Sequence, residues 1–448
     1  MTTGDGAPHT VGRGPTRLAP VLIGVMGLLM APTLACEREP PAHDAAADRP
    51  AIPTHQTEWQ PGMDGHWMRA PQPAIDDDAD LDRLAALGYA DGFQQAEQAV
   101  GVTVYDPDRA LDGLNLYCSG HEPAAYLMDM AGHVVHRWAL AYTDVPNPTP
   151  NPHRWFSGSW RRVRLLDDGS LLAIYENLGL VKLDRDSRIV WWFDGRAHHD
   201  LDLMPDGSIV VLTRERAFRR ELEPPRTVID DFVSFVSPDG VEQRRISILD
   251  ALLRSDDFRH LVPRRRDRQP DLFHTNTVEV LDDRLAEHGP AFRPGNLLLS
   301  MRHLDTIAVL DPQTETVVWA ARDGWRWQHE PTALANGDIL LFDNLGGGTA
   351  SRVLEIDPGT LATTWVYQGD PPESFFSVYC GTASRLSNGN TLITETCAGR
   401  AFEVTPSHDV VWRFVSPHRA GEGGELVAAL FEVVRIPERP AWLDEGTE

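Results

Sequence analysis

Short apolar runs that follow tight turns recur along the chain from about residue 113 onward. A typical copy is "LMPDGSIVVL" at 203–212, in which Pro, Asp and Gly precede an aliphatic run. A turn of this kind followed by a short β-branched run predicts a β-hairpin and not a helix. The turn glycines of the clear copies are Gly169, Gly207, Gly295, Gly337 and Gly389.

Further strands follow each copy, often with an aspartate turn that precedes a strand containing tryptophan. Examples are "VKLDRDSRIVWWF" at 181–193 and "IAVLDPQTETVVWAA" at 307–321. The tryptophans are interpreted as the core of each unit. Four short strands per unit and six units predict an all-β fold, a six-bladed β-propeller. The blades are expected near residues 114–140, 160–193, 199–248, 274–320, 329–366 and 379–416.

Two segments do not fit this repeat, and each is interpreted separately. The first unit lacks its innermost strand, and "ELVAALFEVVRI" at 425–436 is expected to supply it and close the ring. Residues 249–273 are interpreted as an insertion between the third and fourth blades, with a helix in "DALLRSDDFRHL" and a basic loop in "PRRRDRQP". The arginines of this loop would line a pocket mouth or, more simply, face solvent.

The residues before the propeller indicate export. Arg13 and Arg17 precede an apolar run that ends in "TLAC" at Cys36, a pattern typical of a lipoprotein signal. Lipidation of Cys36 is the first interpretation, a cleaved secretory signal the second and an uncleaved anchor the third. All three predict a periplasmic or otherwise extracytoplasmic protein, and lipidation would attach it to a membrane.

The expected organisation follows from these patterns. A stretch rich in Pro, Ala and charge predicts a flexible tether, and "DDDADLDRLAALGYADG" after it predicts a short helix near the N-terminus of the folded part. The expected segments are a signal at 1–36, a tether at 37–75, a short helical lead-in at 76–112, the propeller at 113–436 and a tail at 437–448.

The net charge indicates which kinds of partner the protein binds, and the cysteine content indicates which disulfide bonds it can form. The formal net charge is −25 at pH 7, which repels phosphate overall; this argues against a nucleic-acid partner, and any anion site must be local. Three cysteines follow Cys36. Cys380 and Cys397 fall in one predicted strand–turn–strand unit and are candidates for a disulfide in an oxidising compartment; one of the three thiols would be left over, and the sequence does not decide which. Free buried cysteines are the alternative interpretation.

Three histidines lie at the starts of predicted innermost strands. His199 and His329 each precede their turn glycine by eight residues. Alignment of "FHTNTVEVL" places His274 two residues earlier, which keeps its side chain on the same strand face. Because innermost strands line the channel of a propeller, the three side chains are expected to converge at one mouth. His198, next to His199, is expected to point the other way.

Polar residues end the second strand of these units, seven residues after the turn glycine. Arg302 is the clearest, and the equivalent residues are Glu176, Arg214, Asn344 and Thr396. Such residues after an apolar strand are not explained by core packing, and His, Arg and Asn at a channel mouth favour an anion-binding site. Three histidines also fit a zinc site. Arg302 argues against a dication, so neither a metal nor another cofactor is expected.

These motifs resemble those of the bacterial arylsulfotransferase family. The resemblance rests on "HHDLDLMPDG", "HTNTVEV", "GNLLLSMR", "QHEPTALANGDILLFDN" and "SRVLEID", and it covers about 110–436. Members are periplasmic six-bladed propellers that move a sulfuryl group from an aryl sulfate to a phenol without a nucleotide donor. Well-known members carry an N-terminal β-domain involved in dimerisation, whereas only a tether and a helix are expected here.

The resemblance implies a ping-pong reaction between small aryl sulfates and phenols, with His329 as the transiently sulfated nucleophile. It implies that His199, His274, Arg302 and Asn276 support the sulfuryl oxygens in the transition state. The remaining polar residues of the mouth, Arg214, Asn344 and Thr396, are candidates for substrate binding. The aromatic residues Trp325, Trp327, Phe375 and Phe376 would form walls for an aryl ring, or else belong to the core.

Two other functions stay open at this point. One is a non-catalytic propeller that binds a ligand or a partner protein on its channel face. The other is a metal-dependent hydrolase that uses His199, His274 and His329 as ligands. A metal assay separates the hydrolase from the transferase, and incubation with a chromogenic aryl sulfate separates the transferase from the binding protein.

Overall fold

The computed structural model describes residues 67–69, 98–150, 152, 154–263, 270–420, 424 and 426–444. The predicted signal at 1–36 and the helix expected within 76–92 lie outside the described residues. So do most of the tether and the basic loop at 264–269. Within the described part of the chain, no helix is long and apolar enough to cross a membrane.

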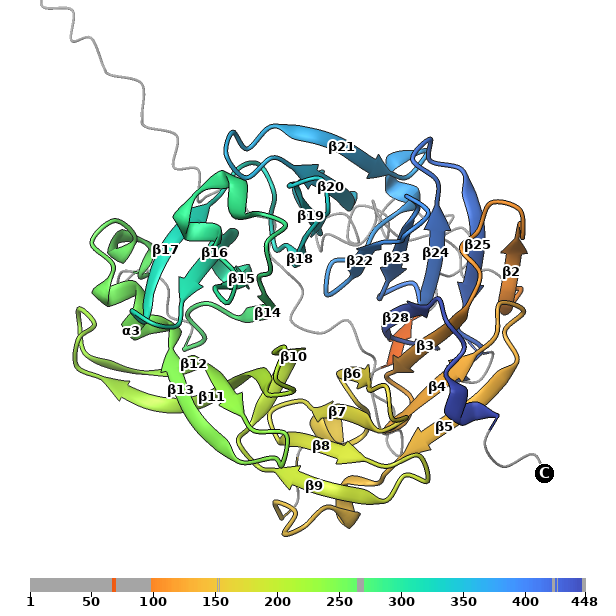
Figure 1. Cartoon of the computed structure of the whole chain (residues 1–448), viewed down its shortest axis with the longest axis horizontal. Helices are drawn as coiled ribbons and strands as arrows, with labels where there is room; N and C mark the ends of the chain where they lie inside the picture. Colours follow the sequence, from red (N-terminus) through yellow and green to blue (C-terminus); the bar gives the residue numbers. More distant parts are fainter. Residues whose placement is uncertain are drawn as a thin grey trace, which may run out of the picture. The chain divides into compact units, whose positions relative to one another are not determined.

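Six antiparallel sheets surround a central axis, which confirms the predicted six-bladed β-propeller (Figure 1). Each sheet is named here as a blade, from its innermost to its outermost strand. Blade 1 is β28 (Leu430–Ile436), β3 (Leu114–Ser119), β4 (Ala124–Met128) and β5 (Val134–Ala139). Blade 2 is β6 (Arg162–Leu165), β7 (Leu171–Tyr175), β8 (Gly179–Leu183) and β9 (Ile189–Phe193). Blade 3 is β10 (Ala197–Leu203), β11 (Ile209–Arg219), β12 (Arg226–Val236) and β13 (Glu242–Ser247).

The second half of the ring repeats this plan. Blade 4 is β14 (Thr275–Val280), β15 (Leu297–Met301), β16 (Thr306–Asp311) and β17 (Thr316–Ala321). Blade 5 is β18 (His329–Ala333), β19 (Ile339–Asp343), β20 (Arg352–Ile356) and β21 (Thr363–Gln368). Blade 6 is β22 (Thr382–Arg385), β23 (Thr391–Glu395), β24 (Arg400–Val404) and β25 (Val410–Val415), with β2 (Gly101–Tyr105) as a fifth, outer strand.

The two ends of the propeller sequence close the ring. The C-terminal strand β28 is the innermost strand of blade 1 and pairs with β3, Leu430 opposite Ser119, as predicted. At the outer edge of blade 6, β2 pairs with β25, so residues 101–105 of the expected lead-in form a strand. Pairing covers backbone groups that an open edge would leave exposed. A small sheet of β1 (Trp67–Arg69), β27 (Leu426–Ala428) and β26 (Arg419–Ala420) precedes β28.

Apolar clusters fill the spaces between neighbouring blades, and large buried side chains such as Trp138 and Trp412 anchor them. The insertion after β13 forms α3 (Ile248–Arg254), as predicted, and its apolar face packs into one of these clusters. Cys118, Cys380 and Cys397 are free, so the disulfide that the sequence suggested does not form. The other helical turns are η1 (Tyr142–Asp144), α2 (Arg154–Ser157), η2 (Arg259–Leu261), η3 (Ala286–His288), η4 (Pro290–Phe292), η5 (Arg302–Leu304), η6 (Pro372–Ser374) and η7 (Ala441–Leu443).

Candidate active site

The innermost strands that carry the histidines are irregular where they begin. We call this end of the channel the mouth. Register shifts interrupt the pairing at 197–201 in β10, 275–277 in β14 and 329–332 in β18. Residues at positive φ accompany them, namely His199 (52°), His274 (48°) and Glu330 (50°). Left-handed backbone is unfavourable for a residue with a side chain, and β-bulges re-aim side chains next to functional sites. Bulges, and not a simple alternation along the strand, therefore direct the histidines.

The bulge in β10 also overturns the expectation for His198. Its ring lies against His199, with the two ring centroids 5.1 Å apart and the two Nδ1 atoms 2.9 Å apart. On its other side, His198 Nε2 lies 3.8 Å from a carboxylate oxygen of Asp231. A regular strand would alternate these two side chains between faces, and the bulge removes that alternation.

The ring of His329 is held by two hydrogen-bond acceptors. Its Nδ1 lies 2.9 Å from the carbonyl oxygen of Trp327 and 2.8 Å from Asn344 Oδ1. The Asn344 amide group donates to the carbonyl oxygens of Ser377 and Cys380, both at 2.6 Å, which fixes Oδ1 as the atom that faces the ring. Nδ1 therefore carries the hydrogen, and Nε2 of the neutral ring keeps a free lone pair.

His329 is neutral at ordinary pH. Burial and the positive charge of Arg302 hold its pKa well below the usual value, and Arg161 and His274 act in the same direction. The hydrogen bond with Asn344 opposes this shift without reversing it. A neutral imidazole with an unprotonated Nε2 is the form that attacks an electrophile.

His199 is held in the opposite tautomer. Its Nδ1 accepts a hydrogen bond from Arg214 Nη2 at 3.2 Å, and a guanidinium is a donor only. Nε2 therefore carries the hydrogen. Burial lowers the pKa of His199 well below its usual value, and the neighbouring His274, Arg161 and Arg214 act in the same direction, so the ring is neutral. His199 thus presents an N–H at the mouth, whereas His329 presents a lone pair.

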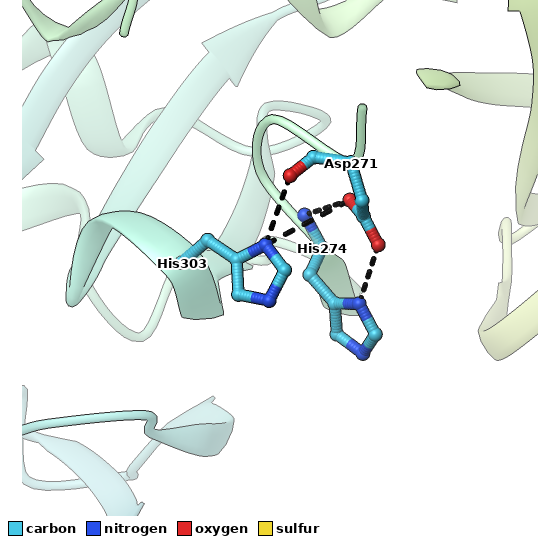
Figure 2. Close-up of side chains that lie close together, drawn as sticks. All are labelled: Asp271, His274 and His303. Carbon is cyan, nitrogen blue, oxygen red and sulfur yellow. Dashed lines mark hydrogen bonds and ion pairs between the residues drawn. The ribbon is translucent and has the colours of Figure 1, made fainter. Parts of the chain in front are cut away.

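The ring of His274 lies beside that of His199, with centroids 4.8 Å apart, and is held by Asp271. Asp271 Oδ2 lies 2.6 Å from His274 Nδ1, and Oδ1 accepts the backbone N–H of the same residue (Figure 2). His303 Nδ1 donates to the backbone carbonyl of Asp271 at 3.0 Å. Burial alone would raise the pKa of Asp271, but His274 and Arg214 hold it well below its usual value.

Arg302 extends from η5 and is 6% exposed. Its guanidinium carbon lies 3.6 Å from the ring centroid of Trp327, the residue whose carbonyl also accepts from His329. Among the described residues, no carboxylate forms an ion pair with this guanidinium, and burial lowers the pKa of Arg302 to about 10. A guanidinium stacked through its face keeps its N–H edge for an anion.

Arg161 is a further cation of the mouth that the sequence-based prediction missed. It is 5% exposed, and its charge acts on both His199 and His329. Its Nη2 lies 3.2 Å from Cys380 Sγ, and no carboxylate in the described part of the chain pairs with it. The sequence contains a pattern that would have identified Arg161. This residue precedes the turn glycine Gly169 by eight residues, the same spacing that identified His199 and His329.

The other predicted residues lie around this group. Asn276 is buried and donates to the carbonyl oxygen of Gln328 at 2.9 Å, which ties β14 to the residue before His329. The Thr396 hydroxyl is buried without a hydrogen-bond partner among the described residues. Glu176 Oε1 lies 3.8 Å from His199 Nδ1. The contacts of Asn276 and Asn344 fit positioning of the His329 strand and ring, a role the sequence did not assign to them.

The aromatic candidates separate into two groups. Trp325 and Phe375 belong to the clusters between blades. Trp327 and Phe376 belong to a separate small cluster, which is the one in contact with Arg302. An aryl ring bound beside the Arg302 guanidinium would therefore contact Trp327 and Phe376, and not Trp325 and Phe375.

An ionic cluster around Arg162 forms the floor of the mouth. The guanidinium meets Asp200 at 3.0 Å, Glu330 at 2.5 Å and Glu432 at 2.5 Å, so it joins blades 1, 2, 3 and 5 across the channel. Burial raises the pKa of Asp200 to about 7, consistent with three carboxylates sharing one guanidinium. Below the cluster the channel holds a cavity of about 460 Å³ lined by the innermost strands. The four residues of the cluster line this cavity, whereas His199, His274 and His329 do not.

Asp271, His274 and His303 bring donor atoms within 4.8 Å of one another, as a metal site would (Figure 2). This set differs from the three histidines of the hydrolase hypothesis, since it lacks His199 and His329. Arg214 Nη1 lies 3.7 Å from the same carboxylate oxygen that holds His274. A guanidinium so close to the ligand atoms opposes a divalent cation by charge repulsion.

The fold and the site together define a six-bladed propeller whose mouth presents neutral histidines, together with Arg161 and Arg302, which pair with no carboxylate among the described residues; this is a site for a small anion. The family model described as "Arylsulfotransferase (ASST)" matches residues 162–417, more than half of the chain. The chain belongs to this family, as the motifs predicted. Membership implies arylsulfotransferase activity and aryl sulfate substrates.

The remaining comparisons are distant. No curated protein matches the chain. The chain is similar to a protein of unknown function from Bacteroides caccae, with 12% identity over 73% of this chain and 100% of the other and a TM-score of 0.47. It is similar to a streptogramin B lyase, with 11% identity, 76% and 94% coverage and a TM-score of 0.43. Virginiamycin B lyase from Staphylococcus aureus gives 9% identity, 58% and 70% coverage and a TM-score of 0.36.

Proposed function

We propose that the protein transfers a sulfuryl group from an aryl sulfate to a phenol through a sulfohistidine at His329. The observation that carries this proposal is the fixed tautomer of His329. Trp327 and Asn344 both accept at Nδ1, so Nε2 of a neutral ring is left as the nucleophilic atom. A histidine held in this way is prepared for attack without prior loss of a proton.

In the first step, Nε2 of His329 attacks sulfur, the bond from sulfur to the aryl oxygen breaks, and the phenolate leaves with the electron pair. Charge on the sulfuryl oxygens is stabilised by Arg302, by Arg161 and by the Nε2–H of His199. In the second step, the oxygen of a phenol attacks the same sulfur, the phenol O–H bond breaks as its proton passes to a base, and the electron pair of the N–S bond returns to Nε2. The two steps use one site in turn, so the kinetics are ping-pong.

The charge balance of the mouth supports an anionic substrate. Arg161 and Arg302 are both buried and neither pairs with a carboxylate among the described residues. A buried charge without a partner is strongly unfavourable. A sulfate ester bound between the two guanidinium groups would compensate both charges. Its electrostatic attraction to each guanidinium about 4 Å away is roughly 4 kcal/mol.

The steady-state test uses a chromogenic aryl sulfate with varied phenol. We expect parallel double-reciprocal lines, and loss of both phenol release and transfer in His329→Asn. His133→Asn, which changes an exposed histidine that pairs with Asp129 in blade 1, serves as the control and keeps wild-type rates. Intersecting lines would contradict a covalent intermediate, and an inert wild-type enzyme would favour the non-catalytic binding protein.

We also propose that residues 1–36 direct export and that Cys36 carries the lipid. Metabolic labelling with a fatty acid tests this. Label on the wild-type protein and none on Cys36→Ser supports lipidation, and unlabelled protein in the soluble periplasmic fraction would favour a cleaved secretory signal.

A further inference from the structure

We propose that Asp271 and His274 form a proton-transfer pair that accepts the proton of the incoming phenol. The inference rests on the sulfotransferase function proposed above and assigns His274 a role other than binding sulfuryl oxygens. Asp271 would act as a positioning residue, because it acts through His274. The hydrogen bonds that fix the tautomer of His329 go to Asn344 and Trp327 and involve neither Asp271 nor His274.

The geometry of the pair is well determined by its surroundings. The Asp271 carboxylate forms two hydrogen bonds with His274, one with the ring Nδ1 at 2.6 Å and one with the backbone N–H at 2.9 Å. Its own backbone accepts from His303 Nδ1, and the preceding Pro270 carbonyl accepts from the backbone N–H of Ile229 in β12. The backbone at 270–271 is thus held by β12 and η5, and the Asp271 carboxylate is held by the backbone N–H of His274 just before β14, so the ring of His274 has little freedom to turn.

The hydrogen bond between Asp271 and the ring Nδ1 sets the tautomer of His274. A carboxylate that accepts at Nδ1 requires the hydrogen there, so Nε2 of the neutral ring is a proton acceptor. His199 has the reverse arrangement, because Arg214 donates to its Nδ1. The two rings are 4.8 Å apart, and one presents a donor where the other presents an acceptor. His199 alone of the pair is therefore suited to bind a sulfuryl oxygen.

The charges around the ring support the same role. Burial lowers the pKa of His274 to about 4 against the opposing effect of Asp271, with Arg302 and His303 adding to the decrease. Arg214, His198 and His199 face the ring from blade 3. His274 is therefore unprotonated before the phenol binds. The ionised Asp271 stabilises the imidazolium once the proton arrives.

The step balances in protons and electrons. The phenol O–H bond breaks, its proton goes to His274 Nε2, and its oxygen forms the new bond to sulfur. The N–S bond of sulfo-His329 breaks with its electron pair returning to Nε2. The imidazolium of His274 then passes its proton to solvent, and the phenolate released from the donor takes up a proton in solution.

A directional consequence follows for the two half-reactions. Since His274 starts unprotonated, it gives no acid assistance to the leaving group of the donor. Donors are then limited to aryl sulfates of acidic phenols, whereas un-ionised phenols serve as acceptors. The donor half-reaction does not need Asp271, and the acceptor half-reaction does.

The test compares Asp271→Asn with wild type in each half-reaction separately. Oδ1 of the new side chain still accepts from the His274 backbone, so its NH₂ group would face Nδ1 and force the other tautomer. We expect the first burst of phenol release from a chromogenic donor to stay within about threefold of wild type. Transfer to an un-ionised phenol should fall by roughly 10²- to 10⁴-fold, the range of general-base catalysis and of a wrong tautomer.

The control and the rescue make the comparison specific. Asp129→Asn removes a comparable Asp–His contact, 3.0 Å between Asp129 and His133, on the outer hairpin of blade 1, and leaves both half-reactions unchanged. Acceptor phenols that are already ionised at the assay pH should restore transfer in Asp271→Asn to near the wild-type rate. Thermal melting of each variant identifies any loss of folding.

Three results would overturn the inference. Equal losses in the burst and in transfer would show a merely structural role for Asp271. Failure of ionised acceptors to rescue a folded variant would show that no proton is being moved. In wild-type enzyme, which needs no folding control, a solvent deuterium isotope effect on donor cleavage and none on transfer would contradict it. A wild-type enzyme without any burst would instead refute the proposed function itself.

Discussion

Replacement of Arg302 is the perturbation whose size the structure defines best. The guanidinium is buried, stacked on Trp327 and without a carboxylate partner among the described residues, and it is the charge that most lowers the pKa of His329. Arg302→Gln removes about 4 kcal/mol of attraction for a sulfuryl oxygen about 4 Å away, which is roughly 10³-fold in kcat/KM. Arg302→Lys keeps the charge but loses the planar, two-pronged set of N–H donors. We therefore expect kcat/KM to fall by roughly 10- to 10²-fold, which corresponds to the loss of about one charge-assisted hydrogen bond.

The two variants should also differ in their pH profiles. Without the positive charge, the pKa of His329 rises in Arg302→Gln, and protonation of Nε2 then removes the nucleophile as pH falls. The acid limb of kcat/KM therefore moves to higher pH in Arg302→Gln and stays in place in Arg302→Lys. The assay is donor cleavage between about pH 5 and 9 with a leaving phenol monitored by absorbance.

The matched control is Arg244→Gln, because Arg244 is also stacked on an aromatic ring, 4.2 Å from Phe235, at a distance from the mouth. It should leave both rate and profile unchanged. An Arg302→Gln enzyme that keeps more than about a tenth of wild-type kcat/KM would refute the electrostatic argument. So would an acid limb that does not move.

Three further predictions follow from particular contacts. Removal of residues 425–448 deletes β28, opens blade 1 along the whole of β3, and should abolish soluble expression; a folded truncation would contradict closure by that strand. His199→Gln keeps an N–H near the position of Nε2 and should retain more donor cleavage than His199→Leu, for which we expect roughly a 10²-fold loss measured by kcat; equal activities would contradict the donor role. Chelators should leave transfer unchanged, because Arg214 and Arg302 flank the Asp271, His274 and His303 cluster, whereas zinc-restored activity would favour the hydrolase.

The fold was predictable because the repeat reports directly on backbone geometry. Turn glycines such as Gly207 and Gly337 require the positive φ that they adopt, 81° and 90°, and the apolar runs after them fit strands. The missing strand of the first repeat predicted the closure that β28 makes with β3. Periodicity of this kind is local, so a single sequence carries it.

The site was predictable only where it follows the repeat. His199 and His329 share one register with Arg161, which the same rule would have found. Asp271 lies in the insertion before blade 4, where no repeat supplies a counterpart, and its contact with His274 depends on a loop conformation. The tautomer of His329 depends on carbonyl oxygens of the irregular segment 377–380, which fix Asn344. Bulges at the strand starts, not strand alternation, aim the rings, so the prediction for His198 was wrong.

The central claim is that His329 Nε2 carries the sulfuryl group between the two half-reactions. Mass spectrometry of enzyme mixed with an aryl sulfate, quenched in base without acceptor and digested, tests it most directly. We predict one sulfuryl group on the peptide that contains His329, its loss when a phenol is added before the quench, and none in His329→Asn. A sulfuryl group on any other residue, or full transfer by His329→Asn, would contradict the account.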